Sequence, residues 1–329
     1  MGKFDPRMTA RTYAAADHDW HIDQALSEVS IQFSQDPSVF IGMDVFPVVP
    51  VGKESDKYYT WDKGDWFRIP TGTLRARATA PKRVEASVSS AGYHAKNYML
   101  EGIIPFEDLT NADVALQLED STARQVTQLL MLDQEYRIAT LATTAANVGS
   151  GNALTGTSRW DDYANSSPIS DVNTGKSWIL QETGQEVTTM VVGYQVHNAL
   201  LQHPDMIDRI KYVQAATQAT VEKALADIFG IRDYKVGKAV MNSGQENQAD
   251  SMSFVWGKNV LMLHRPPAPG RNVPSAGYCF RWKPEGFTDF VVETKDDDDI
   301  KARLKRVGYF QDEVVTAKSL MYLLSTVVN

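Results

Sequence analysis

The best candidate for a nucleotide-binding motif is the run of residues 151–156, Gly-Asn-Ala-Leu-Thr-Gly, whose two glycines have the spacing of a phosphate-binding loop. In such a loop a lysine follows the second glycine and reaches the phosphates, whereas this chain continues with Thr157 and Ser158. No strand pattern precedes the run. We therefore interpret it as a flexible loop, and no G-x-G-x-x-G run in a strand-to-helix context offers a second nucleotide site.

Histidines are the next candidates, as ligands of a metal ion. His18 and His21 stand three residues apart and can share a helix face, but no third ligand lies near them in the sequence. His197 and His203 lie on either side of an expected helix break. Ordinary polar or capping roles explain these four side chains better, so we expect no metal and no other cofactor.

Two residues could act as nucleophiles. Ser275 lies in the run Val-Pro-Ser-Ala-Gly, which lacks the leading glycine of the sharp turn that exposes a catalytic serine. Cys279 lies in a strand-like run between two aromatic residues, where a buried structural thiol is more common than a reactive one. We therefore expect no catalytic residue and interpret the chain as a protein that is not an enzyme.

One stretch of the chain concentrates positive charge without any acidic residue. Between Trp66 and Val84 lie five basic side chains, those of Arg68, Arg75, Arg77, Lys82 and Arg83. The whole chain is acidic, with a formal net charge of −8, which argues against an extensive nucleic-acid-binding face. The five cations are therefore either a solvated surface or a contact with an acidic neighbouring subunit, and both interpretations stay open here.

The basic residues belong to a predicted β-hairpin that runs from residue 57 to about residue 104. Aromatic residues up to Phe67 favour the outgoing strand, and the alternation of apolar and polar residues over 84–88 favours the returning strand. Residues 70–73, Pro-Thr-Gly-Thr, supply the turn. A hairpin of this length has little core of its own, so it must pack against something else.

Elsewhere the pattern alternates helices with strands. The strongest helical periodicity runs from residue 106 to 146, enough for a spine on the order of 50 Å long. Residues 147–175 are rich in Gly, Ser, Asn and Asp and predict a loop, and the prolines in 45–51 predict an edge strand or an extended arm. Further helices are expected at 22–33, 194–202, 205–212 and 220–229, and strands at 188–192, 234–241, 254–263, 278–282, 290–293 and 303–310.

Length and composition describe an ordinary globular protein. The chain has 329 residues, of which 43% are hydrophobic, enough for one large core or two modest ones. It has a single cysteine, so no intrachain disulfide can form. No signal peptide or apolar run of membrane-spanning length is present, and we expect the chain to be made in the cytoplasm without membrane association.

The order of these parts resembles the Hong Kong 97-type capsid fold, an α+β fold shared by the major capsid proteins of tailed phages and by encapsulin shells. The amino-acid sequences of two stretches are also similar to phage coat proteins. These are residues 45–50, Val-Phe-Pro-Val-Val-Pro, and residues 193–205, Gly-Tyr-Gln-Val-His-Asn-Ala-Leu-Leu-Gln-His-Pro-Asp. In the terms of that fold, residues 1–56 correspond to the N-terminal arm and 57–103 to the extended hairpin called the E-loop. The P-domain with its spine helix takes 104–175, the A-domain takes 176–285, and the returning P-domain strands take 286–329.

The resemblance implies a major capsid protein that assembles into pentamers and hexamers of an icosahedral shell around double-stranded DNA, without sequence-specific binding. It implies location in the virion, assembly in the host cytoplasm, and as partners a separate scaffolding protein, a portal and, in some members, decoration proteins. The five basic hairpin residues become candidates for contact between subunits. Two alternatives remain at this point, an encapsulin-like compartment and another phage structural protein such as a tail-tube subunit.

Overall fold

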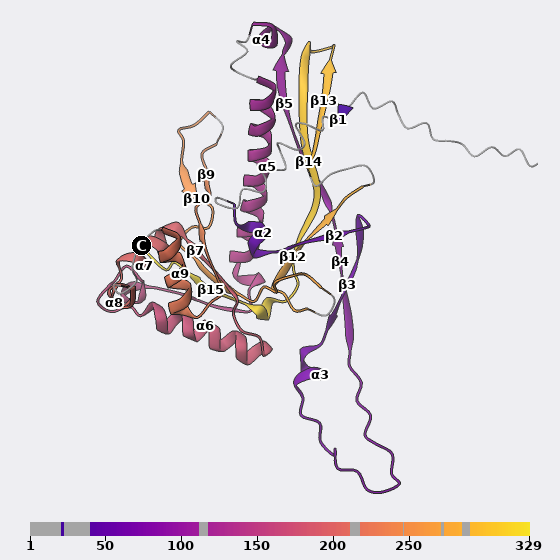
Figure 1. The fold of residues 1–329 in the computed structure, drawn as a ribbon, viewed down its shortest axis with the longest axis vertical. Helices are drawn as coiled ribbons and strands as arrows, with labels where there is room; N and C mark the ends of the chain where they lie inside the picture. Colours follow the sequence, from indigo (N-terminus) through magenta and orange to yellow (C-terminus); the bar gives the residue numbers. More distant parts are fainter. Residues whose placement is uncertain are drawn as a thin grey trace, which may run out of the picture.

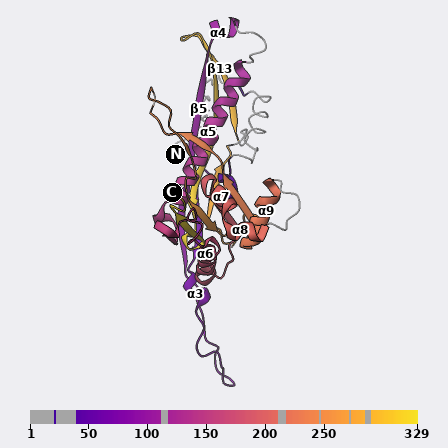
Figure 2. The same ribbon diagram turned by 90° about the vertical axis from the view of Figure 1, so that its left-hand side faces the viewer.

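One long helix, α5 (Leu118–Thr143), runs along the longest axis of the molecule (Figure 1). The computed structural model describes residues 21–22, 40–111, 118–210, 218–245, 247–270, 273–284 and 290–329. A long sheet lies along α5, a compact α/β unit lies at the carboxyl end of the helix, and a narrow hairpin extends beyond both. Figure 2 shows that the hairpin and the opposite, upper end of the molecule lie at the two extremes of one axis.

The long sheet is organised around strand β14, which pairs with three other strands. The order is β1-β13-β14-β12-β2, and β5 pairs with β14 outside this path. All pairs are antiparallel except β2 with β12. The bounds are β1 (His21–Ile22), β2 (Val48–Val51), β5 (Lys96–Pro105), β12 (Gly277–Trp282), β13 (Val291–Asp297) and β14 (Ala302–Val315).

The spine helix packs closely on this sheet. Val126, Leu130 and Met131 of α5 form one buried cluster with residues of β13 and β14. Gly102 of β5 lies directly under the helix, because a Cβ at this position would overlap the Thr122 methyl group. A residue without a side chain is therefore needed here for the strand to approach the helix.

The compact unit is built on a second sheet, with the strand order β6-β15-β11-β7-β8. Strand β7 is buried along its whole length, which explains its continuous apolar sequence. The strands are β6 (Ser150–Ala153), β7 (Thr189–Gly193), β8 (Asp233–Gly237), β11 (Val260–Leu263) and β15 (Met321–Ser325). The helices are α6 (Pro168–Thr183), α7 (Tyr194–Gln202), α8 (Pro204–Ile210) and α9 (Gln218–Phe229), and a small hairpin joins β9 (Val240–Asn242) to β10 (Met252–Phe254).

The projecting hairpin consists of β3 (Ser55–Trp61) and β4 (Val88–His94), paired antiparallel with Ser55 opposite His94. The short helix α3 (Lys63–Phe67) follows β3. Residues 68–87 form an open loop without strand pairing at the far end. Two further short helices, α2 (Gly42–Val45) and α4 (Phe106–Asn111), precede the hairpin and the spine helix respectively.

Several sequence predictions are confirmed. The helix at 194–202 matches α7 residue for residue, and α9 ends before Gly230, which adopts a left-handed conformation (φ 61°) as a helix-terminating glycine does. The proline-marked strand Val48–Val51 lies at the edge of its sheet, where a missing N–H does no harm. The strands expected at 188–192, 278–282, 290–293 and 303–310 are also present, within a few residues.

Other predictions are wrong, each for a physical reason. The returning hairpin strand begins at Val88 rather than at residue 84, and Trp66 lies in α3 rather than in a strand, because Asp62 caps that helix through the N–H of Gly64. The loop expected at 147–175 contains β6 and the start of α6, which begins with Pro168 in the first turn.

Two expected strands are each divided in two. The strand at 234–241 is interrupted where Gly237 passes directly beneath the Trp256 ring, and the strand at 254–263 is interrupted by the turn that carries Trp256. Helix α8 starts at Pro204 instead of Asp205. The helix expected at 22–33 lies outside the described residues from position 23 onward, as do positions 112–117 of the predicted spine helix.

Candidate assembly surfaces

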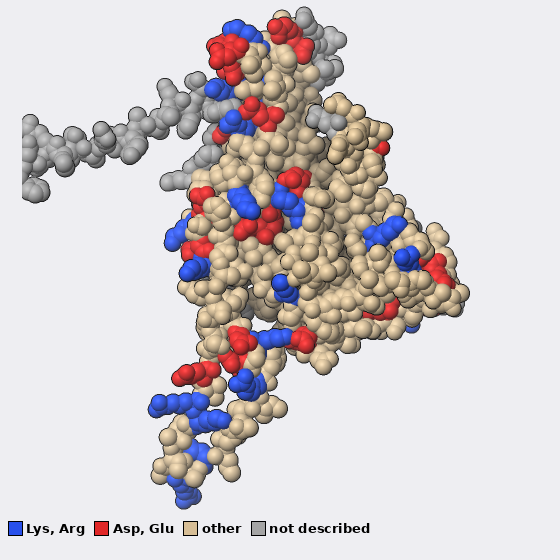
Figure 3. Space-filling view, turned by 180° about the vertical axis from the view of Figure 1, so that it is seen from behind, with Lys and Arg blue, Asp and Glu red and all other residues tan. Residues whose placement is uncertain are grey.

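The five basic residues singled out in the sequence all lie in the open loop at the far end of the hairpin, where Figure 3 shows Lys and Arg crowded together. Every residue from 66 to 90 is exposed. Lys82 donates through Nζ to the carbonyl oxygen of Thr71 at 2.7 Å, which closes the loop across its width. Within the described part of the chain none of the five forms an ion pair with an acid within hydrogen-bond distance, although Arg68 lies near enough to Asp65 to help lower the pKa of that carboxyl. Their charge is therefore available to another molecule.

The hairpin as a whole, including this loop, exposes large apolar side chains. Of twenty such exposed side chains among the described residues, eight lie between Tyr59 and Val88, and the most exposed are Ile69 at 85% and Leu74 at 97%. Arg mixed with aromatic and aliphatic side chains is typical of protein–protein interfaces, and such apolar patches are uncommon on free monomers. The composition therefore indicates a protein partner for the hairpin.

The base of the hairpin is anchored to the long sheet. Tyr93 stacks on Phe280 of β12 with ring centroids 4.6 Å apart, and Tyr58 stacks on the same ring at 5.6 Å. The N–H of His94 donates to the Asp312 carboxylate at 3.0 Å. These contacts fix the direction in which the hairpin leaves the body.

Helix α3 gives the hairpin a second anchor, on the compact unit. Lys63 forms an ion pair with Glu182 near the carboxyl end of α6, and the Phe67 ring lies over Gly184. On the hairpin itself, Asp65 accepts hydrogen bonds from Oγ and N of Ser87 at 2.6 and 2.9 Å, and these bonds hold the pKa of Asp65 below its usual range. The two strands therefore stay together up to α3, and only the loop beyond it is unsupported.

The opposite end of the molecule is acidic. It consists of α4 and the turn between β13 and β14, which are joined by a hydrogen bond from the N–H of Phe106 to the carbonyl oxygen of Lys301 at 3.0 Å. Asp298 pairs with Lys301 and Asp296 pairs with Arg303. Four further acids at this end have no basic partner among the described residues: Glu107, Asp108, Asp297 and Asp299.

Several charges along the spine helix are paired within the chain. Arg137 of α5 donates to Glu313 Oε1 and to the Tyr309 hydroxyl, both at 2.9 Å, and its guanidinium lies 3.6 Å from the centre of the Tyr98 ring. Buried Lys305 reaches Glu119 Oε2 at 2.7 Å, in the first turn of α5. These pairs hold the helix on the sheet.

A buried carboxylate joins three separate segments. Glu135 of α5 is 2% exposed and accepts hydrogen bonds from Gly42 N at 2.6 Å, Trp256 Nε1 at 2.6 Å and Ile41 N at 3.2 Å. Burial raises the pKa of the Glu135 carboxyl, against the opposite effect of the three donors. The side chain therefore connects the spine helix to the segment before β2 and to the compact unit.

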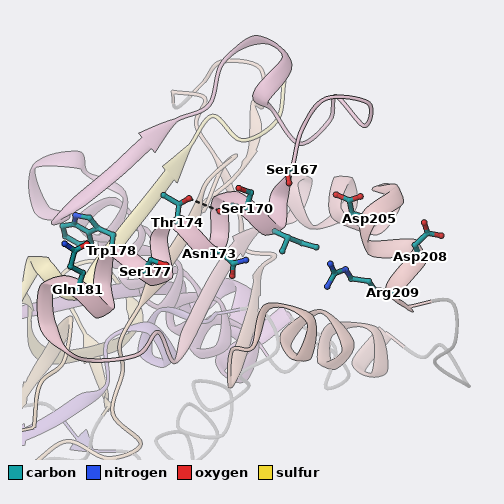
Figure 4. Close-up of a pocket in the computed structure, with 11 residues that line it drawn as sticks. Ser167, Ser170, Asn173, Thr174, Ser177, Trp178, Gln181, Asp205, Asp208 and Arg209 are labelled. Atoms are coloured by element: carbon teal, nitrogen blue, oxygen red, sulfur yellow. Dashed lines mark hydrogen bonds between the residues drawn. The ribbon is translucent and has the colours of Figure 1, made fainter.

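The remaining candidate for a ligand site is a hollow between α6 and α8, shown in Figure 4. Its floor is the exposed face of α6, with Ser170, Asn173 and Ser177, and α8 contributes acidic and basic side chains at one end. None of its lining residues is a histidine or cysteine, and its two carboxylates, Asp205 and Asp208, come from α8 rather than from the serine-bearing face of α6.

The structure does not bring the other sequence candidates into a reactive arrangement. Residues 151–153 lie in strand β6, Ser275 donates to the carbonyl oxygen of Gly277, and burial raises the pKa of the Cys279 thiol well above its usual value. His203 contacts Ser166, and His197 contacts the Tyr234 hydroxyl, whereas His18 lies outside the described residues. The described ranges contain no group of His, Cys, Asp and Glu able to hold a metal ion, and no helix in them could cross a membrane.

No protein-family model matches the chain. The sequence is 26% identical over 313 residues to a protein named major capsid protein from Pseudomonas phage JBD67, covering 93% of this chain and 97% of that protein. It is 27% identical over 279 residues to the major capsid protein of Burkholderia phage BcepMu, covering 83% of this chain and 87% of the relative.

Solved structures show the same architecture. A phage-related protein from Bordetella bronchiseptica RB50 matches with a TM-score of 0.71 at 23% identity, over 93% of this chain and 97% of that one. The capsid of cyanophage P-SCSP1u matches with a TM-score of 0.59 at 12% identity over 88% of each chain, and a virus-like particle from Pyrococcus furiosus with 0.55 at 11%, over 92% and 98%. The α+β fold is therefore that of phage capsid proteins, the Hong Kong 97-type fold that the sequence predicts.

Proposed function

We infer that this chain is a major capsid protein, the subunit from which a bacteriophage builds the shell around its genome. The observation that carries the inference is the match of nearly the whole chain to two phage proteins of that name, together with a fold shared with capsids. This role is supported by the projecting hairpin, whose far loop carries five exposed basic residues and the two most exposed large apolar side chains of the described residues, Ile69 and Leu74.

In the assembled shell, five or six copies surround each symmetry centre. Residues 57–103 form the E-loop, 104–175 and 286–329 form the P-domain, 176–285 form the A-domain, and residues 1–56 form the arm. Each subunit lays its hairpin across a neighbour, with Arg68, Arg75, Arg77, Lys82 and Arg83 at the contact. Each contact is weak, and the closed lattice sums many of them.

The chain acts as a container for double-stranded DNA and has no catalytic role. Its net charge of −8 disfavours extended binding of the DNA backbone, so the genome is held by enclosure. Assembly takes place in the host cytoplasm with a separate scaffolding protein, and a portal occupies one vertex. Decoration proteins can occupy the outer surface.

An encapsulin-like compartment is the second candidate, because the fold also matches the virus-like particle from Pyrococcus furiosus. At 11% identity that likeness concerns the fold alone, whereas the two sequence relatives are both phage proteins. Nothing in the described residues favours a tail-tube subunit over a shell subunit.

Electron microscopy of the purified chain, alone and coexpressed with its neighbouring genes, tests the proposal. Closed icosahedral shells, or rings with fivefold and sixfold symmetry, are expected. Shells purified from infected cells contain DNA if the protein is a capsid, and contain a cargo enzyme if it is a compartment. Monomers under every condition would contradict both assignments.

A further inference from the structure

The small hairpin of β9 and β10 projects from the compact unit, and we call it the ribbon (residues 240–245 and 247–254). Among the described strands its two strands pair only with each other, so both outer edges are free. Val240 and Met252 lie on one face and are 40% and 65% exposed. Asp250 is the only charged residue in these two ranges. Because exposed protein surface is ordinarily rich in charge, this composition indicates a contact surface.

The end of the ribbon is held in one conformation by its own side chains. Asn242 Oδ1 accepts a hydrogen bond from Ser251 N at 2.9 Å, and Asn242 Nδ2 donates to Asp250 Oδ1 at 2.7 Å. At the base, Phe254 packs on Tyr194 of α7 with ring centroids 5.2 Å apart. A projection that is already ordered loses little entropy when it binds, so the ribbon is prepared for a partner.

The hollow between α6 and α8 has a volume of about 950 Å³ and a neutral floor. Arg209 is the one cation among its lining residues, and it has no acidic partner within the described ranges. Figure 4 shows Arg209 extending from α8 toward α6, whereas the carboxylates of Asp205 and Asp208 point away from it. The exposed α6 residues that line the hollow are all uncharged: Ser170, Asn173, Thr174, Ser177 and Gln181.

The ribbon and the hollow lie on opposite sides of the compact unit. In Figure 1 the ribbon leaves the upper side of this unit and α6 runs along its lower side, and Figure 2 shows the same arrangement. The ribbon therefore cannot reach the hollow of its own subunit, whereas a second copy offers one. A contact between two different surfaces of identical subunits repeats from copy to copy and closes into a ring.

We propose that the ribbon of one subunit inserts into the hollow between α6 and α8 of the next copy. Asp250 at the end of the ribbon faces Arg209, and Met252 packs beside Ile169, which lines the same hollow. The inference rests on the proposed function and names two surfaces of the compact unit that join neighbouring subunits. Because the acid of one copy meets the cation of the next, the charges fix the direction in which the subunits follow one another.

Engineered cysteines test the contact, because the single natural cysteine, Cys279, is buried. Gln248→Cys places a thiol at the end of the ribbon and Asn173→Cys places one on the floor of the hollow. Oxidised shells carrying both should give covalent ladders up to hexamers on a denaturing gel. The control, Gln248→Cys with Lys223→Cys, moves the second thiol to α9 and should give about tenfold less product, since a disulfide needs Cα atoms within about 7 Å.

Shells without ladders, or equal ladders from the control, would overturn the inference and leave the proposed function in place. A ribbon thiol that joins a different protein of the particle would overturn it as well. Failure of the unaltered chain to form shells or rings would instead remove the proposed function.

A charge reversal gives a readout that does not depend on the cysteine variants. Arg209→Glu should lower the shell yield by about tenfold, since the contact repeats at every subunit, and should leave the subunit folded by circular dichroism. Lys223→Glu is the control of equal charge change and should assemble as the unaltered chain does. Normal shells from Arg209→Glu, or an equal loss in the control, would show that Arg209 does not receive the ribbon.

Discussion

Replacement of Glu135 by alanine tests whether one buried carboxylate holds the spine helix, the segment before β2 and the compact unit together. The side chain accepts hydrogen bonds from Ile41 N, Gly42 N and Trp256 Nε1, and all three donors lie in the interior. Alanine leaves each of them without an acceptor. An unsatisfied buried donor costs about 1–2 kcal/mol, so we expect the free energy of unfolding to fall by roughly 3–6 kcal/mol.

Urea unfolding of the isolated subunit, followed by far-ultraviolet circular dichroism, measures this loss. Gln128→Ala is the matched control, because Gln128 is exposed on the same helix, and surface substitutions of this kind change stability by less than about 0.5 kcal/mol. Hydrogen exchange gives a second readout, since the amides of residues 41 and 42 should exchange faster in the alanine variant. A loss no larger than that of the control, with unchanged exchange at both amides, would refute the reasoning.

The pH dependence of the same substitution follows from the raised pKa of Glu135. The folded state holds the proton more tightly than the unfolded chain, whose carboxyl titrates near 4.5. The contribution of the Glu135 carboxyl to the free energy of unfolding is therefore fully present below pH 4.5. It is lost as the pH rises through the folded pKa. The difference in stability between the unaltered chain and Glu135→Ala should shrink over that interval.

Three further predictions concern the tip, the spine and the acidic end. Leu74→Ser should leave the melting temperature of the subunit unchanged, because the side chain is 97% exposed, but should lower the shell yield. Gly102→Ala should lower the unfolding free energy by about 1–3 kcal/mol, because the new methyl group would overlap Thr122; an unchanged melting temperature would argue against close packing there. Asp296→Asn should cost about 0.5–1 kcal/mol at neutral pH, since Arg303 lowers the pKa of the exposed Asp296 carboxyl. Stability from that pair is present above pH 3.8 and is lost as the pH falls through the folded pKa, so the cost in thermal unfolding should vanish in acid.

Much of the fold follows from local signals in the sequence. Helix α7 has its apolar residues on one face, the two prolines at 47 and 50 exclude a central strand, and Gly230 ends α9. Helix α6 carries no such signal, because serine, threonine, asparagine and glycine are weak helix formers. Its helical state depends on tertiary packing, above all at Gly175, which lies against the side chains of Met262 and Tyr322.

Of the two candidate surfaces, the basic one could be predicted from local sequence and the acidic one could not. The basic residues could be located from the sequence, since five cations without an acid within twenty residues form a local pattern. The acidic end could not, because it combines Glu107 and Asp108 with Asp299, nearly two hundred residues later. Only the pairing of β5 with β14, which sets Pro105 opposite Ala302, brings them together. The sequence contains one signal for Glu135, because this acid lies between the apolar residues Met131 and Ile138 on the buried face of a helix.

The pairing of β14 with β5 and the central place of β15 also determine when a newly made chain can fold. Strand β5 has no partner until the ribosome has added residues 302–311, and the compact sheet lacks the strand between β6 and β11 until residues 321–325 emerge. Contacts that span so much sequence form late and slowly. A chain released early by the ribosome therefore lacks one strand from the middle of each sheet, β14 in the long sheet and β15 in the compact one.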